Sequence, residues 1–344
     1  MYKKKLKIFL GAYLNYNNAQ NLNCLALEKY LDSSKFTTYA LSIYSSSKVN
    51  TKAILFHCFY PFRISSALGF LWGVIKCDIA YLPKHKSTPN WIIYIAILLG
   101  KKVFTTIENN MCDSEKESML NSFGSRKNLV NKFKYVPNIF GITQYIIDNA
   151  NCGVRLENKV LYLGVETNFF SQKLRKKLKN IVFVGNLKKR KRVGEFLQLA
   201  EKFPGINFNI IGDGIERASL MIKAAKNVTF FGHLNQQEVA SKFNEMDLHI
   251  LPSISEGFPK VILEAASAGI PSIVYSNYGA SEWIVNNENG FIVDNFEELT
   301  TTLNRIIDSE DLLSRNSDGA ILLAKKFDWK IVIREWEEVI YNLR

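Results

Sequence analysis

Two carboxylates, Glu256 and Glu264, stand with seven residues between them in a segment that also contains turn residues and a helix former. The run Leu248–Leu251 before them predicts a strand, residues 253–259 favour a turn, and Val261–Ala268 favours a helix. One glutamate then lies where the helix begins and the other about two turns along it. Backbone N–H donors and two carboxylates around one crevice suit an anionic, polyhydroxylated ligand.

The order of short motifs around these carboxylates resembles a known family. From Ile210 to Asp294 the chain contains IIGDG, VTFFGH, MDLHILPSISEGFPKVILEAASAGIPSIVY, YGASEWI and NGFIV. This order is similar to the donor-binding domain of the family 4 retaining glycosyltransferases, which have the GT-B fold. Two earlier pieces, Gly164-Val165-Glu166 and Phe183–Leu187, agree with it. The resemblance covers the C-terminal half of the chain with high specificity and the N-terminal half only weakly.

The resemblance implies which residues contact the phosphates of a nucleoside diphosphate. Lys191 aligns with the phosphate-binding lysine of the family, and positive charge is what such a ligand needs. The family usually has arginine where this chain has Asn186, so one cation is missing. Lys189 or Arg190 could replace it. Taken alone, this basic run would also fit a solvated turn.

The same resemblance assigns the sugar contacts. Glu264 is expected to accept hydrogen bonds from the ribose hydroxyls and Glu256 from hydroxyls of the transferred sugar. His233 and Leu234 are expected to meet the nucleobase through backbone groups, although a surface role suits the His233 side chain better. The backbone after Glu256 is expected to contact sugar or phosphate through Gly257, Phe258, Pro259 and Lys260.

Three further positions, two of them in the first domain, bear on the site. Gly11 and Gly257 stand where a side chain would keep the backbone away from a ligand. The resemblance places Gly11 at the end of the first strand, near the diphosphate and sugar, although glycine is common at strand ends. Glu108 follows the fourth strand of the first domain, where many relatives have histidine. It could bind sugar hydroxyls, or the site could be adapted to another donor.

Strands and helices alternate along the chain in the way that builds parallel sheets covered on both faces. The predicted fold is α/β, with two Rossmann-like domains facing a cleft and ligands at the carboxyl ends of the strands. The expected division is an N-terminal acceptor domain, 1–165, a donor domain, 166–329, and a C-terminal helix, 330–344, that crosses back. First-domain strands are expected at Lys7–Leu10, Tyr39–Ile43, Ile79–Tyr81, Val103–Thr106 and Phe140–Thr143. Second-domain strands are expected at Asn180–Val184, Asn207–Ile211, Val228–Phe231, Leu248–Leu251, Ser272–Tyr275 and Gly290–Val293.

The implied reaction is transfer of a sugar from a nucleoside-diphosphate sugar to an acceptor hydroxyl with retention, in surface-polysaccharide assembly. Glu256, Lys191 and Glu108 are the expected catalytic residues, and no metal is expected because Asp-x-Asp is absent from the chain. A nucleotide-sugar epimerase and a catalytically silent binding subunit are the alternatives. A panel of nucleotide sugars, with and without acceptor, separates the three.

Length and cysteine usage set the context. A chain of 344 residues is long enough for two domains. Its five cysteines show no C-x-x-C pair, which predicts a reduced, cytoplasmic protein with neither disulfide nor zinc. The basic lead-in, residues 1–5, precedes an apolar stretch too short for a signal peptide, so a buried first strand is expected. The cysteines are Cys24, Cys58, Cys77, Cys112 and Cys152.

The net charge of +12 lies entirely on the first domain, where residues 1–165 carry 21 Lys and Arg against 9 Asp and Glu, while the rest carries 23 against 23. Without a nucleic-acid-binding motif, an anionic membrane surface or the phosphates of a lipid-linked acceptor are the favoured partners. A solvated basic face is the alternative. The longest apolar run, Trp91–Leu99, predicts a buried helix, with interfacial membrane contact as the other possibility. The lysines around it are Lys84, Lys86, Lys101 and Lys102.

Overall fold

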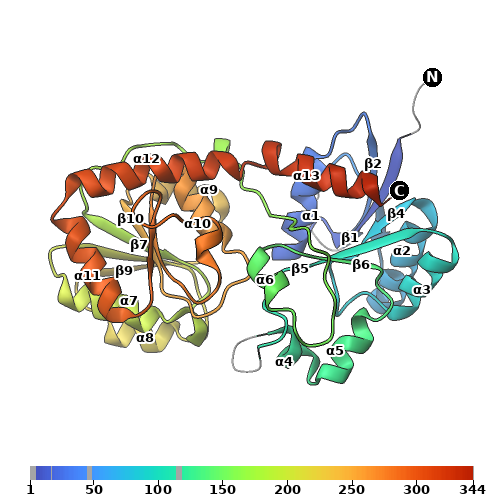
Figure 1. The fold of residues 1–344 in the computed structure, drawn as a ribbon, viewed down its shortest axis with the longest axis horizontal. Helices are drawn as coiled ribbons and strands as arrows, with labels where there is room; N and C mark the ends of the chain where they lie inside the picture. The colour runs from blue at the N-terminus through green and yellow to red at the C-terminus, as the bar shows by residue number, and fades with distance from the viewer. Residues whose placement is uncertain (1–4, 17, 45–48, 114–117, 344) are drawn as a thin grey trace.

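The computed structural model describes residues 5–16, 18–44, 49–113 and 118–343, which form two α/β domains (Figure 1). Each domain contains a six-stranded parallel sheet with helices packed on it. The predicted fold class is therefore confirmed. Of the basic lead-in, residues 1–4 lie outside the described residues.

The first sheet has the strand order β3-β2-β1-β4-β5-β6. Its strands are β1 (Leu6–Tyr13), β2 (Phe36–Ile43), β3 (Ile54–Cys58), β4 (Ile79–Tyr81), β5 (Lys102–Ile107) and β6 (Asn138–Gly141). Its helices are α1 (Ala19–Tyr30), α2 (Phe62–Lys76), α3 (Asn90–Leu98), α4 (Met119–Phe123), α5 (Arg126–Phe133) and α6 (Gln144–Asp148). The prediction missed β3, a half-exposed edge strand, and placed β6 two residues too late because Thr143 caps α6 instead of extending the strand.

The second sheet has the order β12-β11-β10-β7-β8-β9. Its strands are β7 (Asn180–Val184), β8 (Asn207–Ile211), β9 (Val228–Gly232), β10 (Leu248–Leu251), β11 (Ser272–Tyr275) and β12 (Phe291–Val293). Its helices are α7 (Val193–Lys202), α8 (Arg217–Lys223), α9 (Gln236–Phe243), α10 (Lys260–Ser267), α11 (Phe296–Ile307) and α12 (Glu310–Lys326). These strands lie where the apolar runs predict them, to within one residue at each end.

The strand order reverses once in each sheet, and a ligand site is expected at these two reversals. In the first sheet β1 pairs with both β2 and β4, and in the second β10 pairs with β7 and β11. Connections that leave a sheet in opposite directions open a crevice at the carboxyl ends of the two strands. The loops after β1 and β4, and after β7 and β10, are therefore the expected ligand-binding loops.

The last helix, α13 (Trp329–Asn342), follows α12 out of the second domain and lies along the first (Figure 1). It packs against α1 and buries Trp329 and Trp336 in the first-domain core. The indole N–H of Trp336 donates to the carbonyl of Tyr162 at 2.8 Å. The helix thus joins the two domains a second time, after the linker that precedes β7.

Helix α3 corrects one prediction. It was expected to be buried, but Trp91, Tyr94, Ile97 and Leu98 are 40% to 84% exposed. These side chains are exposed because α2 and α3 pack against each other on the outer side of the first domain (Figure 1). Within the part of the chain that the structure describes, no helix is both long enough and apolar enough to cross a membrane.

Candidate functional site

The reversal of strand order in the second sheet brings Lys191 and Glu256 together. Lys191 ends the 3₁₀ turn Lys189–Lys191 after β7, and Glu256 lies on the loop after β10. The Lys191 Nζ lies 2.5 Å from Glu256 Oε1, and both residues are less than 10% exposed. Residues 65 positions apart in sequence therefore form one buried ion pair at the carboxyl ends of neighbouring strands.

Arg190 supplies the second cation at this point. Its Nη1 lies 3.1 Å from Glu256 Oε1 and donates to the carbonyl of Ser255 at 2.6 Å. The side chains of Asn186 and Lys189 are exposed. Of the two candidates for the missing family arginine, Arg190 is the one whose guanidinium faces the glutamate.

Two cations around one carboxylate leave this group with an excess of positive charge. Burial by itself would raise the pKa of the Glu256 carboxyl, but Lys191 and Arg190 outweigh burial, and its pKa lies below the usual range. His249 on β10 adds no charge, because burial and the nearby Lys191 lower its pKa to about 3. Such an excess suits the two phosphates of a nucleoside diphosphate.

The second glutamate lies on α10, which starts directly after Pro259, where the fixed φ of proline suits helix entry. Burial raises the pKa of Glu264, and Lys260, one turn earlier, offsets only part of that rise. Burial likewise lowers the pKa of Lys260. Lys260 begins the helix, Glu264 lies one turn along it, and both side chains are half-buried. The ribose role of Glu264 stays a prediction.

Phe258 packs between the two domains. Its ring centroid lies 5.4 Å from that of Trp283, 5.8 Å from that of Phe327 and 6.3 Å from that of Tyr162. The ring is therefore occupied by contacts within the protein, and the expected contact of its backbone with a ligand stays a prediction. The side chain instead fixes the loop that carries Glu256.

Gly257 and Gly11 each leave no room for a side chain, but the neighbouring atoms differ. A Cβ on Gly257 would lie 1.8 Å from the carbonyl oxygen of Glu108, so this glycine lets the loops of the two domains touch. Gly11 was expected at the end of the first strand, and that placement is wrong because β1 continues to Tyr13. A Cβ on Gly11 would lie 2.8 Å from Leu82 Cδ2, inside the first domain. Packing within the domain therefore explains Gly11, and its contact with a ligand stays a prediction.

A pocket of about 420 Å³ lies between the domains, next to Glu256 and Gly257. Its first-domain wall was not predicted from the sequence, although a polar pair after a buried strand, Asn109 and Asn110, was a usable signal. The lining of this interdomain pocket includes neither His233 nor Leu234, which follow β9; His233 is exposed and Leu234 half-buried. The pocket is lined by Asn109, Asn110, Ser118, Met119, Asn121, Ser122, Lys188, Arg190, Ser255, Glu256 and Gly257.

Glu108 lies at the carboxyl end of β5, beside Gly257. Its Oε2 accepts a hydrogen bond from Asn23 Nδ2 at 3.1 Å. Burial raises the pKa of Glu108 to about 7, despite the opposing effects of Lys260 across the domain boundary and of Asn23. Its carboxyl is therefore present in both protonation states near neutral pH. Among the described residues, no group of three His, Cys, Asp or Glu side chains is placed to hold a metal, and the expected metal independence rests on the sequence alone.

Glu282, in the motif YGASEWI, fixes the domains relative to each other. Its carboxylate accepts the backbone N–H groups of Gln144 and Tyr145, at 2.7 and 2.5 Å, from the start of α6 in the first domain. Tyr162 Oη donates to the same carboxylate at 3.1 Å. A second-domain side chain thus caps a first-domain helix, a contact between domains that sequence spacing does not reveal.

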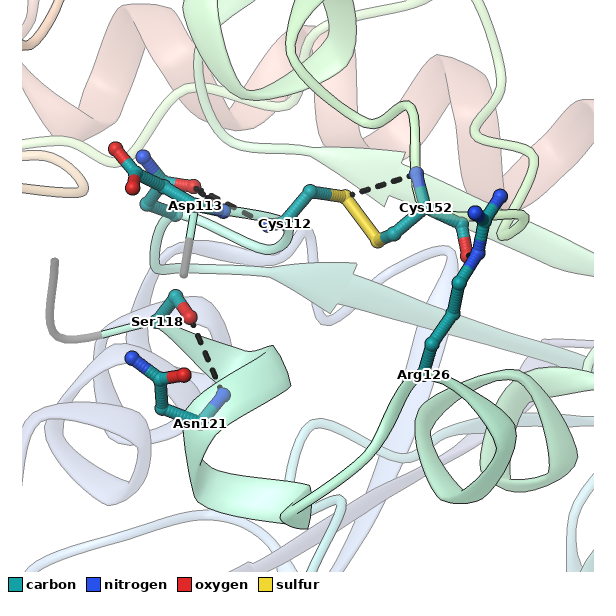
Figure 2. Close-up of a disulfide and its surroundings, with 7 residues drawn as sticks. Cys112, Asp113, Ser118, Asn121, Arg126 and Cys152 are labelled. Atoms are coloured by element: carbon teal, nitrogen blue, oxygen red, sulfur yellow. Dashed lines mark hydrogen bonds between the residues drawn. A yellow bond between two sulfur atoms is a disulfide. The ribbon is translucent and has the colours of Figure 1, made fainter. Parts of the chain in front are cut away.

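The cysteines correct another prediction. Cys112 and Cys152 form a disulfide, whereas no disulfide was expected (Figure 2). Cys112 follows β5 and Cys152 follows α6, so the neighbouring strands β5 and β6 bring together residues 40 positions apart. Arg126 Nε donates to the carbonyl of Cys152 at 2.9 Å and links the start of α5 to the disulfide. The argument from cysteines for a reducing compartment therefore no longer holds, and cytoplasmic location stays a prediction.

We expect reduction of this disulfide to destabilise the first domain. In the loop-entropy account, a crosslink across 40 residues stabilises by up to about 4 kcal/mol. Urea unfolding of the oxidised and reduced protein measures the difference. The double variant Cys112→Ser, Cys152→Ser is the control and should not respond to reductant. Equal midpoints for the oxidised and reduced wild type would contradict a stabilising crosslink.

Comparison with known proteins agrees with this geometry. The sequence model of the family described as glycosyl transferases group 1 matches residues 164–321. An uncharacterized glycosyltransferase of Haemophilus influenzae is 29% identical over 174 residues, 47% of this chain and 49% of that protein. The capsular polysaccharide biosynthesis glycosyltransferase CapM of Staphylococcus aureus is 27% identical over 217 residues, 54% of this chain and 56% of that protein. The chain thus matches about half the length of these curated relatives.

Solved structures share the architecture along the whole chain. HepE (Alr3699) of Anabaena in complex with UDP matches with a TM-score of 0.79 at 15% identity, over 98% of this chain and 100% of that one. Sucrose-phosphate synthase from Thermosynechococcus elongatus matches with a TM-score of 0.79 at 11% identity, over 99% of both chains. At such identities the likeness shows the fold alone. The fold is GT-B, and residues 164–321, most of the second domain, match the model of the glycosyl transferases group 1 family.

Proposed function

We propose that the chain is a retaining glycosyltransferase that moves a sugar from a nucleoside-diphosphate sugar to an acceptor hydroxyl on a saccharide or lipid-linked saccharide. The observation that carries this proposal is the group of Lys191, Arg190 and Glu256 at the reversal of strand order, in which Lys191 and Glu256 form a buried ion pair and Arg190 and Glu256 line the interdomain pocket. This group lies in the part of the chain that matches the family. The capsular polysaccharide relative supports a role in surface-polysaccharide assembly.

In the proposed reaction the protein positions groups and stabilises the leaving diphosphate. Lys191 and Arg190 supply the positive charge that the β-phosphate needs as the sugar departs. Glu256 holds hydroxyls of the sugar, and Glu264 holds the ribose. The departing phosphate oxygen takes the acceptor proton on the same face of the sugar, which gives retention. Glu108, whose backbone carbonyl adjoins Gly257 across the domain boundary, contacts sugar or acceptor hydroxyls.

Incubation with a panel of nucleotide sugars, with and without saccharide acceptors, tests the function. A transferase gives a donor-dependent glycoside only when an acceptor is present. An epimerase changes the nucleotide sugar without an acceptor, and a silent binding subunit turns over nothing. HepE structures contain UDP and UDP-glucose, so uridine nucleotides are the first donors to test.

The partner proposed for the first domain is an anionic membrane that presents a lipid-linked acceptor. Its outer apolar face consists of side chains at least 40% exposed on α2 and α3, namely Ile64, Leu68, Ile75, Trp91, Tyr94, Ile97 and Leu98. Arg63 and Lys76 lie exposed on α2, Lys86 and Lys102 lie exposed on the segments before and after α3, and Asp78 is the only acidic residue from 61 to 102. An exposed apolar face with a basic rim suits an anionic bilayer surface.

Lys84 does not belong to this face. It was grouped with the surrounding lysines, but it is only 7% exposed and its Nζ donates to Asn21 Oδ1 at 2.9 Å. The loop after β4 turns it into the domain rather than out to solvent. The membrane face is therefore tested with Lys76 in its place.

We expect binding to anionic vesicles at low salt that falls steeply as salt rises, since each exposed Lys or Arg contributes about 1 kcal/mol near such a surface. Leu98→Ser, or joint replacement of Lys76, Lys86, Lys101 and Lys102 by Gln, should weaken cosedimentation while nucleotide binding persists. Joint replacement of the exposed second-domain lysines Lys176, Lys202, Lys223 and Lys226 by Gln is the matched control. No preference for anionic over neutral vesicles at low salt would rule the membrane partner out.

A further inference from the structure

The buried ammonium of Lys84 has no carboxylate within ion-pair distance among the described residues. Its Nζ donates to Asn21 Oδ1, which also accepts the backbone N–H of Tyr13, and lies 5.1 Å from the centre of the Tyr13 ring. An ammonium has three N–H donors, so the amide oxygen leaves donor capacity unused. Charges are buried in proteins mainly when they are paired, which makes this lysine a candidate for binding an anion.

Lys84 lines a second cavity, the first-domain pocket, of about 200 Å³. The pocket lies where the loops after β1 and β4 diverge, the reversal of strand order in the first sheet. Gln20 Nε2 donates to the carbonyl of Pro83 at 2.8 Å and joins the start of α1 to the loop after β4. The pocket is lined by Gln20, Lys84, His85, Lys86, Ser87, Glu108, Asn109, Met119, Ser122 and Phe123.

The charges that face this pocket are mostly positive. Lys86 adds an exposed ammonium, while burial lowers the pKa of His85 to about 3, so its ring is neutral. Glu108 is the only carboxylate in the lining, and burial raises its pKa to about 7, which weakens it as a counter-charge near neutral pH. Burial also lowers the pKa of Lys84, and a bound anion would offset that cost.

The first-domain pocket adjoins the interdomain pocket, because Asn109, Met119 and Ser122 line both. A ligand in one pocket therefore lies next to a ligand in the other. We propose that the first-domain pocket binds an anionic group of the acceptor, the carboxylate of an acidic sugar or the phosphate of a lipid-linked saccharide, and that Lys84 holds its charge. The term acceptor rests on the proposed function; the anion site itself does not.

Titration calorimetry of the full chain with three probes tests the site: methyl glucuronide, glucose 1-phosphate and the neutral methyl glucoside. We expect at least one anionic probe to bind tenfold or more tightly than the glucoside. Lys84→Met should reduce that preference about tenfold, whereas Lys84→Arg should retain most of it. Lys127→Gln, which removes an exposed charge on α5, is the matched control. Preference for glucose 1-phosphate alone points to a phosphate linker, and preference for the glucuronide to an acidic sugar.

Binding of UDP serves as the fold control, since Lys191, Arg190 and Glu264, which are proposed to hold it, lie on the other domain. Equal affinity of the wild type for all three probes overturns the site even if no Lys84 variant folds. An anionic preference that survives in Lys84→Met with normal UDP binding also overturns it. If the nucleotide-sugar panel gives no glycoside, the proposed transferase function is refuted. The binding results still decide whether the anion site exists.

Discussion

Glu256→Gln is expected to lower turnover by tenfold or more while the domain stays folded. The carboxylate accepts a charge-assisted hydrogen bond from Lys191 and forms an ion pair with Arg190, and one such hydrogen bond contributes about 1.5 to 3 kcal/mol. Glutamine keeps the shape but removes the charge that positions both cations and, by the proposal, a sugar hydroxyl. Glu264→Gln should also lower turnover by about tenfold or more, through the ribose. Steady-state kinetics with the donor found by the panel measures both variants.

Glu201→Gln is the matched control, since Glu201 is exposed on α7 in the same domain. It should leave turnover unchanged. Wild-type turnover in both Glu256→Gln and Glu264→Gln, with the wild-type unfolding midpoint, would move the site away from α10 and the loop before it.

Lys191→Ala is expected to weaken binding of a nucleoside diphosphate about tenfold or more and to leave binding of the matching nucleoside nearly unchanged. The reason is that the ammonium acts on the phosphates alone, and a charged hydrogen bond contributes about 1.5 to 3 kcal/mol. The variant also removes one partner of a buried ion pair, so a lower unfolding free energy is expected. Titration calorimetry with both ligands, at a temperature where the variant is folded, gives the comparison.

Lys188→Ala provides the control, because Lys188 lines the interdomain pocket without contacting Glu256 in the way Lys191 does. Its loss should cost less. An equal loss of affinity for diphosphate and nucleoside in Lys191→Ala would place the lysine outside the phosphate site.

The second domain could be predicted closely from the sequence because its strands are buried on both faces. Runs such as Asn180–Val184 and Ser272–Tyr275 are nearly continuous apolar stretches bounded by turn residues, and each became a strand with those bounds. The motif order singled out Lys191 and Glu256, which the structure brings together, and their ligand contacts stay predictions. In the first domain, β3 is a short edge strand with a half-exposed face, so its apolar pattern was too weak to identify.

What the sequence could not show depends on contacts between distant segments. The disulfide joins residues that follow β5 and α6, and a separation of 40 residues gives no local pattern from which to predict the pairing. Glu282 caps a helix of the other domain, which no local pattern encodes. Lys84 lies in a basic stretch that reads as surface, yet the turn after β4 buries it. Composition located the basic domain correctly but could not separate a buried lysine from its exposed neighbours.

A crystal structure of the chain with the nucleoside diphosphate of its donor tests the central claim most directly. The account predicts the diphosphate at Lys191 and Arg190, with the ribose hydroxyls at Glu264, in the crevice after β7 and β10. A nucleotide bound instead at the first-domain pocket beside Lys84, or away from both reversals of strand order, would contradict it.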